Sequence, residues 1–142
     1  MRNRNTAPRP SLAGTARLVG VFKSKGKIVL LHAWNTQRGY RMGTLEELAR
    51  LQRREDSTFT VLAVALDAGG SRDVLAFMKD HPDLALRWSL PARLSSFSEP
   101  LGGFIQLPRT YVIDRQGRLR EEIALRSSRK IEAALRAAIR EP

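Results

Sequence analysis

The residues of this chain that could do chemistry lie in two short stretches next to apolar runs. The first stretch follows the run Ile28–Trp34 and reads Asn-Thr-Gln-Arg-Gly-Tyr-Arg over residues 35–41. The second is Leu107–Arg109, which contains a proline. Gln37 carries an uncharged amide, and a tyrosine such as Tyr40 keeps its proton near neutral pH. These groups can bind and form hydrogen bonds, but none of them is a thiol.

The absence of cysteine from all 142 residues excludes several reactions. Dithiol–disulfide exchange and thiol-based (peroxiredoxin-type) peroxidase chemistry both require a thiolate. The two histidines do not form a metal-ligand pattern, because His32 lies within an apolar run and His81 precedes a proline. We expect His32 to be a buried, hydrogen-bonded histidine, and we expect Asp67 and Asp114 to cap turns. Phosphate-binding and nucleophile-elbow glycine motifs are absent, so no metal and no cofactor are predicted.

Alternating apolar and amphipathic segments predict an α/β fold that positions these stretches. Buried parallel strands come first, and a hairpin around the turn Asp114–Gly117 followed by a helix closes the chain. The predicted strands are Gly14–Phe22 (a short edge strand or hairpin), Ile28–Trp34, Phe59–Leu66, Leu84–Trp88, Thr110–Ile113 and Leu119–Ala124. The predicted helices are Gly43–Glu55, a helix from Ser71 as N-cap through Asp80, and Ser128–Arg140, with Ser95–Phe104 as loop.

Both stretches belong to longer motifs. Residues 26–41 read GKIVLLHAWNTQRGYR, and residues 107–117 read LPRTYVIDRQG. They resemble the TlpA/ResA-like branch of the thioredoxin superfamily (AhpC/TSA-redoxin type), whose motifs run GK-V-V-L-x-x-W-A-T-W-C-x-x-C-R and G-x-P-T-T-F-L-I-D-x-x-G. The resemblance covers residues 14–140 and implies a thioredoxin-like fold with a central mixed sheet flanked by helices. Gln37, or Arg38 if the register moves by one residue, then replaces the attacking cysteine, and Tyr40 replaces the resolving cysteine.

The resemblance also implies what the second stretch does. Pro108 matches the family's cis-proline, and Leu107 before it would offer backbone groups to an extended peptide. The alternative is that Pro108 only shapes a turn. The binding face implied in this way contains Trp34, Gln37, Arg38, Gly39, Tyr40, Arg41, Leu107, Pro108 and Arg109.

Three arginines of that face, Arg38, Arg41 and Arg109, are expected to converge near a helix N-terminus, with Trp34 and Tyr40 beside them. Guanidinium groups at a positive helix end would form an anion pocket for a carboxylate, a phosphate or an acidic peptide. The alternative is that all three are ordinary solvated arginines. The sequence thus predicts a redox-inactive thioredoxin-like domain that binds a peptide or protein at the former active-site face, and an acidic partner is one candidate.

The net charge of +11, with 25 basic and 14 acidic residues, keeps two other functions open. A strongly basic chain favours acidic partners, so a charge-driven binder of nucleic acid or a membrane surface is one alternative. No nucleic-acid-binding motif supports it, and the arginines are scattered along the chain. The other alternative is an enzyme that uses the same anion-binding face for non-thiol chemistry.

The length predicts one domain, which we place at residues 14–142 behind a flexible basic arm at residues 1–13. The longest apolar runs have the length of strands and are too short to span a bilayer. The first residues are basic but no apolar segment follows, so no signal peptide is expected in the chain as written. Relatives in the resembled family are commonly periplasmic, and the resemblance alone implies that compartment.

Overall fold

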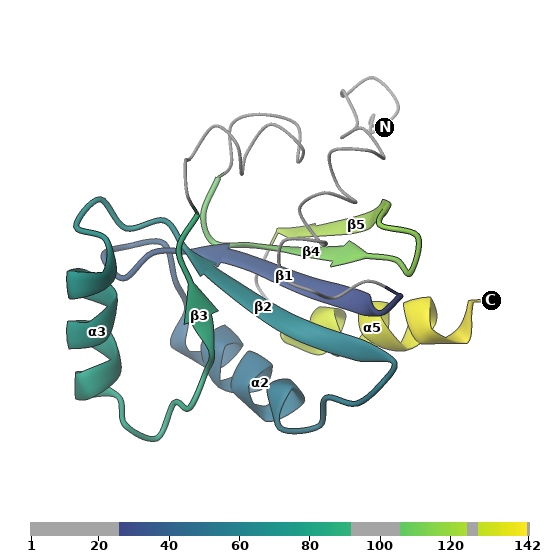
Figure 1. The fold of residues 1–142 in the computed structure, drawn as a ribbon, viewed down its shortest axis with the longest axis horizontal. Coiled ribbons are helices and arrows are strands. Elements are labelled where there is room, and N and C mark those ends of the chain that lie inside the picture. The colour runs from purple at the N-terminus through teal and green to yellow at the C-terminus, as the bar shows by residue number, and fades with distance from the viewer. Residues whose placement is uncertain (1–25, 92–105, 125–127, 142) are drawn as a thin grey trace.

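The computed structural model describes residues 26–91, 106–124 and 128–141 (Figure 1). They form a mixed five-stranded sheet with the strand order β3-β2-β1-β4-β5. Strands β1, β2 and β3 are parallel, β4 is antiparallel to β1, and β5 is antiparallel to β4. The strands are β1 (Ile28–Trp34), β2 (Phe59–Ala65), β3 (Trp88–Ser89), β4 (Arg109–Ile113) and β5 (Leu119–Ala124). The α/β thioredoxin-like fold class predicted from the sequence is confirmed.

Strand β1 lies at the centre of the sheet because its seven residues can be buried on both faces. Side chains alternate between the faces of a strand. Ile28, Leu30 and Trp34 therefore belong to the larger apolar cluster, and the intervening Val29, Leu31 and Ala33 belong to a second cluster on the opposite face. The continuous apolar sequence of this strand is thus explained by its central position.

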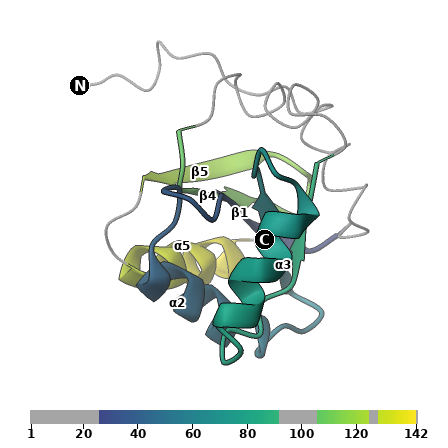
Figure 2. The same ribbon diagram turned by 90° about the vertical axis from the view of Figure 1, so that its left-hand side faces the viewer.

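Three helices pack against the larger cluster, and Figure 1 and Figure 2 show α2 and α5 side by side beneath the sheet. Each buries an apolar stripe at helical spacing and exposes its charged side chains. They are α2 (Met42–Gln52), which buries Leu45, Leu48 and Leu51; α3 (Ser71–Asp80), which buries Val74 and Phe77; and α5 (Ser128–Arg140), which buries Ile131, Leu135 and Ala138.

Three details of the predicted elements were wrong. Helix α2 ends at Gln52 rather than at Glu55. The N-cap of α3 is Gly70, at φ 66°, and Ser71 is already the first helical residue. The predicted strand Leu84–Trp88 is reduced to the pair Trp88–Ser89.

The shortened strand has a local cause in the side chain of Gln52. Its Nε2 donates a hydrogen bond to the carbonyl of Ala85 (2.8 Å), and its Oε1 accepts one from the backbone N–H of Arg87 (2.8 Å). Leu84 and Leu86 are buried in this loop, and their alternation with exposed residues is the pattern of a strand. The backbone of the loop, however, bonds to the Gln52 side chain and not to a neighbouring strand.

Some predictions concern residues that the structure does not describe. The edge strand Gly14–Phe22, the arm at residues 1–13 and the loop Ser95–Phe104 lie outside the described ranges, so the domain boundary at residue 14 stays a prediction. Within the described ranges, no helix combines the length and the apolar character that crossing a membrane would need.

Candidate functional site

The two polar stretches meet at one end of the sheet because of the strand directions. Strand β1 ends at Trp34, and the antiparallel β4 begins at Arg109, which pairs with Ala33. The turn at residues 35–41 and the loop at residues 106–108 therefore leave the sheet at the same edge. We call the surface formed by these two segments the turn–loop face.

Gly39 and Leu107 are the residues at which the two halves of this face touch. A Cβ atom added at Gly39 would lie 2.9 Å from the Cβ of Leu107 and 2.9 Å from Oδ1 of Asn35. Real Cβ atoms do not approach other atoms this closely without displacing them, so Gly39 must lack a side chain for the two halves to meet as they do. The predicted proximity of the turn to Leu107 is thus found in the structure.

The turn is closed by the side chain of Asn35. Its Oδ1 accepts hydrogen bonds from the backbone N–H groups of Gln37 (3.2 Å), Arg38 (3.2 Å) and Gly39 (2.7 Å). The N–H of Asn35 in turn donates to the carbonyl of Gly39 (3.0 Å). The oxygen of one amide side chain thus accepts hydrogen bonds from three consecutive N–H groups, so these groups are not available as donors to a bound anion.

Two carboxylates attach the turn to the second parallel strand and to α3. The backbone N–H of Thr36 donates to both carboxylate oxygens of Asp67 (3.2 Å each), and the Thr36 hydroxyl donates to Oδ2 of the same residue. The Nε2 of Gln37 donates to Oδ2 of Asp73 (3.3 Å), in the first turn of α3. Gln37 therefore acts as a hydrogen-bond donor on the surface, which an uncharged amide can do.

An aromatic cluster supports the turn from below. Trp34 is wholly buried, and its ring meets that of Phe77 edge to face, with 5.5 Å between centroids. Tyr40 is half-buried and packs on the same Phe77 at 5.0 Å. The inclusion of Trp34 in a partner-binding surface was therefore wrong. This residue positions the turn, and Tyr40 is the aromatic residue of the turn with exposed area.

The loop on the other side of the face carries backbone groups that have no partner among the described residues. The bond between Leu107 and Pro108 is cis, as the family resemblance implies. The Leu107 side chain packs on the second apolar cluster. Within the described residues, the N–H and C=O of Leu107 make no hydrogen bond.

Arg109 does not join the other two arginines. It is the first residue of β4 and lies two positions before Tyr111, so its side chain is on the face of the second cluster. Its guanidinium pairs with Glu122 on β5 and donates to Oε1 of Gln106 (3.1 Å). Helix α2, which Arg41 precedes, packs on the opposite face. The prediction of one pocket shared by three arginines was wrong because Arg109 has a carboxylate partner on the neighbouring strand.

Arg38 and Arg41 are both exposed, and neither forms an ion pair within the described residues. Arg41 is the N-cap of α2, which begins only at Met42. The positive end of the helix thus lies beyond the Gln37–Tyr40 positions rather than within them. With the N–H groups of Gln37, Arg38 and Gly39 bound to Asn35, the donors left for an anion at this face are these guanidinium groups and the first N–H groups of α2, which no side chain caps.

Among the described residues, His32 is a titratable group that is fully buried beneath the site. Its Nδ1 hydrogen-bonds the hydroxyl of Thr110 across β1 and β4 (2.8 Å), and its Nε2 has no partner among the described residues. Burial lowers its pKa to about 3, so the ring is neutral at physiological pH. The predicted buried, hydrogen-bonded histidine is confirmed.

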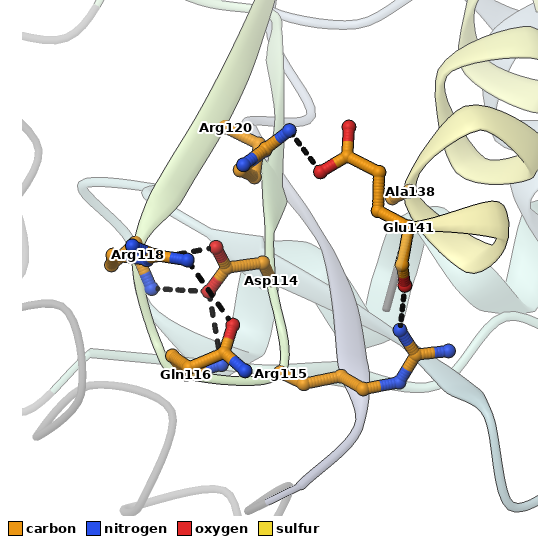
Figure 3. Close-up of a pocket in the computed structure, with 7 residues that line it drawn as sticks. All are labelled: Asp114, Arg115, Gln116, Arg118, Arg120, Ala138 and Glu141. Atoms are coloured by element: carbon orange, nitrogen blue, oxygen red, sulfur yellow. Dashed lines mark hydrogen bonds and ion pairs between the residues drawn. The ribbon is translucent and has the colours of Figure 1, made fainter.

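A second feature lies at the opposite end of the sheet, around the β4–β5 turn (Figure 3). Asp114 accepts hydrogen bonds from the backbone N–H groups of Gln116 and Arg118 (2.9 Å each), which confirms its predicted turn-capping role. The cavity there has a volume of only about 20 Å³, room for one water molecule. Its arginines bond to Asp114, to Glu141 and to the last carbonyls of α5. Within the described residues, no cluster of three metal-ligating side chains occurs at either end.

Sequence reasoning missed Asn35, Asp73 and Phe77 as residues that build the turn. The signal for Asn35 was present, because an asparagine directly before a polar, glycine-containing segment is a common turn initiator. The contacts of Asp73 and Phe77 join α3 to a segment more than 30 residues earlier, and no local pattern reports such a contact.

Comparison with solved structures identifies the fold. The chain is similar to a thiol:disulfide interchange protein from Chlorobium tepidum TLS, with a TM-score of 0.68, 19% identity and coverage of 83% of each chain. A secreted thiol-disulfide isomerase from Corynebacterium glutamicum has a TM-score of 0.67 and 20% identity, with coverage of 85% of this chain and 75% of that one. StoA from Bacillus subtilis has a TM-score of 0.63 and 15% identity, with coverage of 77% of this chain and 82% of that one.

No protein-family model and no curated protein sequence matches the chain. The structural likeness confirms the fold that the resemblance to TlpA- and ResA-like proteins implied. The chain has the fold of the thiol-disulfide oxidoreductases of the thioredoxin superfamily, and it has that fold without a single cysteine.

Proposed function

We propose that this protein is a redox-inactive thioredoxin-like domain that binds an extended segment of a partner protein at the turn–loop face. The observation that carries the proposal is the backbone of Leu107, which has no hydrogen-bond partner among the described residues and is held against Gly39 where β4 begins. A free N–H and C=O beside a strand end can pair with an extended chain as a further strand would.

The composition supports binding rather than catalysis at this face. The chain supplies no thiolate, so a bound segment cannot exchange disulfides with it. The imidazole of His32 is buried and neutral, and its Nδ1 hydrogen-bonds the hydroxyl of Thr110 inside the protein. It is therefore not exposed to a partner at the face. The groups that remain at the face are amide, guanidinium, phenol and backbone, which are suited to hydrogen bonding.

A random peptide library of about twelve residues, displayed and selected against the folded protein, tests the proposal. Enriched peptides added to the isotope-labelled protein should shift the amide resonances of Gly39, Tyr40 and Leu107. Enrichment no greater than on an empty support, or shifts confined to other surfaces, would contradict it.

Two variants of one residue provide the matched control. Leu107→Pro removes the backbone N–H, whereas Leu107→Ala keeps it and shortens only the side chain. We expect the proline variant to lose peptide binding and the alanine variant to retain it, with circular dichroism showing that both are folded. Equal binding by the two would mean that the Leu107 N–H takes no part.

A further inference from the structure

We propose that the segment bound at the turn–loop face is acidic, and that Arg38 and Arg41 bind its carboxylates. This inference rests on the proposed peptide-binding function and names the chemical class of the partner. It is argued from the way in which the chain pairs its arginines, from the placement of Arg41 and from the hydrogen bonds of the turn.

Most arginines of the described residues already have an oxygen partner. Arg50, Arg54 and Arg136 surround Glu132, and Arg115 donates to carbonyls at the end of α5. The other carboxylate-paired arginines are Arg72 (3.9 Å from Asp73), Arg87, Arg109, Arg118 and Arg120. Arg38, Arg41, Arg53 and Arg140 are exposed and form no ion pair among the described residues, and of these only Arg38 and Arg41 stand three positions apart in one turn.

The carboxylates nearest the turn do not neutralise these two arginines. Asp67 accepts the bonds of Thr36, and Asp73 accepts the bond of Gln37. Both carboxylates therefore hold the turn in place from the β2 and α3 side, and they leave the two guanidinium groups available to a partner.

Arg41 also occupies a position that helix stability does not explain. It is the N-cap of α2, its side chain makes no capping hydrogen bond, and the first turn of the helix contains no acidic residue. N-cap positions favour short polar side chains, and a cation near a helix N-terminus opposes the helix dipole. The side chain thus adds positive charge where the backbone is already positive, which favours an anionic partner.

The hydrogen bonds of the turn favour separate carboxylates over a compact phosphate. A phosphate is commonly bound by several consecutive backbone N–H groups. Here the N–H groups of Gln37, Arg38 and Gly39 all bond to Asn35. The guanidinium groups of Arg38 and Arg41 and the first N–H groups of α2 remain, spread over residues 38–43. An extended chain presents its alternate side chains on one face, which suits acidic residues at alternate positions to two separate arginines.

Synthetic peptides provide the test. Three fluorescent peptides of about twelve residues, with alternating Glu-Thr, Gln-Thr or Lys-Thr sequences, are titrated with the full chain, and binding is followed by anisotropy. We expect the Glu-Thr peptide to bind best. Arg38→Gln and Arg41→Gln should each weaken its binding about threefold, the loss expected for one exposed ion pair.

Arg53→Gln is the matched control. Arg53 is exposed and unpaired within the described residues, and it caps the other end of the same helix, about 18 Å from Arg41. The same charge is removed there, so the affinity should not change. An equal loss in Arg53→Gln would mean that the peptide responds to diffuse positive charge, which overturns the inference.

The peptide series separates this inference from the function on which it rests. If the Gln-Thr peptide binds as well as the Glu-Thr peptide and shifts the Leu107 amide, the face binds extended chains without preferring acidic ones. If neither those peptides nor the random library shifts that amide, the peptide-binding function itself is refuted.

Discussion

Gly39 allows two segments that are distant in the sequence to meet at one edge of the sheet. Its missing side chain lets the turn lie against Leu107 and lets Asn35 reach the turn amides. The glycine matters here through the space that it leaves open, since a Cβ would collide with both neighbours.

Gly39→Ala should therefore destabilise the protein by about 1–3 kcal/mol, the usual range when extra volume is forced into a packed site. Gly43→Ala is the control, because a Cβ there meets nothing within 4 Å. Gly43 lies in α2, so its alanine variant should be neutral or up to about 1 kcal/mol more stable. Urea unfolding measures both, and equal effects would contradict this role for Gly39.

His32 should make the stability of the fold depend on pH. Its pKa in the folded state is lowered to about 3 by burial, whereas an exposed histidine titrates near 6.5. Between these two pKa values His32 binds a proton in the unfolded chain but not in the folded one. The free energy of unfolding therefore decreases as the pH falls from about 6.5 toward 3. Between pH 7 and pH 5 this should remove about 2 kcal/mol from the free energy of unfolding.

Urea unfolding at several pH values measures this slope in variants of each histidine. His32→Leu, which places an apolar side chain in a buried site, should flatten the slope between pH 7 and pH 5. His81→Gln, at a half-buried residue at the end of α3, should leave most of it. A slope that persists in His32→Leu would assign the titration to another group.

At the scale of elements, the turn at residues 35–41 depends on a single side chain for its closure. Asn35→Ala removes the acceptor of three N–H groups, whereas Asn35→Asp keeps an oxygen in the same place. Unsatisfied donors cost about 1–3 kcal/mol when they are shielded from water. We expect amide hydrogen exchange of Gln37, Arg38 and Gly39 to accelerate about tenfold in the alanine variant and little in the aspartate variant.

Helices α2 and α5 are joined by charge as well as by packing. Glu132 of α5 pairs with Arg50 of α2, with Arg54 just beyond the end of α2, and with Arg136 of its own helix. The hydrogen bond from Arg50 is the main cause that lowers the pKa of Glu132 to about 2. The charged Glu132 therefore contributes its full share to the stability of the fold above pH 4.5. That contribution is lost as the pH falls toward 2 and the carboxylate is protonated.

Glu132→Gln should lower the free energy of unfolding by about 1 kcal/mol or less, because the pairs are at the surface. High salt should reduce the difference from the wild type, since exposed charges are screened. Glu46→Gln is the control, at an exposed residue of α2 that forms no ion pair within the described residues. A loss that is independent of salt would point to packing rather than charge.

The sequence predicted those elements that carry their own periodic signal. The run Ile28–Trp34 and the helix Ser128–Arg140 have the expected bounds, because continuous apolar residues and a 3.6-residue stripe are local features. Leu84–Arg87 was misassigned because its partner is a glutamine side chain on α2.

The candidate site was predictable only in outline. The family resemblance predicted that the turn lies beside Leu107, and in the structure Gly39 of the turn lies against Leu107. The pairing of Arg109 with Glu122 depends on the register between β4 and β5, which the sequence alone does not specify. The burial of Trp34 under Phe77 depends on where α3 packs, and this contact also links distant segments.

At the scale of the whole molecule, the chain shares its fold with thiol-disulfide proteins but lacks the cysteines that thiol chemistry requires. The related structures are thiol-disulfide proteins by their names, and this chain contains no sulfur atom that can form a disulfide. In an insulin-reduction assay driven by dithiothreitol, we expect the same rate of precipitation with the protein as with buffer, and a faster rate with an ordinary thioredoxin. A rate above buffer that persists after repurification would contradict the proposal that the protein is redox-inactive.

The closure of the turn by Asn35 has a consequence for where the protein can work. A turn closed by a disulfide exists in two covalent states, and the balance between them follows the reduction potential of the compartment. Amide hydrogen bonds do not respond to that potential, so this turn keeps one shape in reducing and oxidising surroundings alike. The surface that it presents to a partner is therefore constant under conditions that would switch a thioredoxin between two forms.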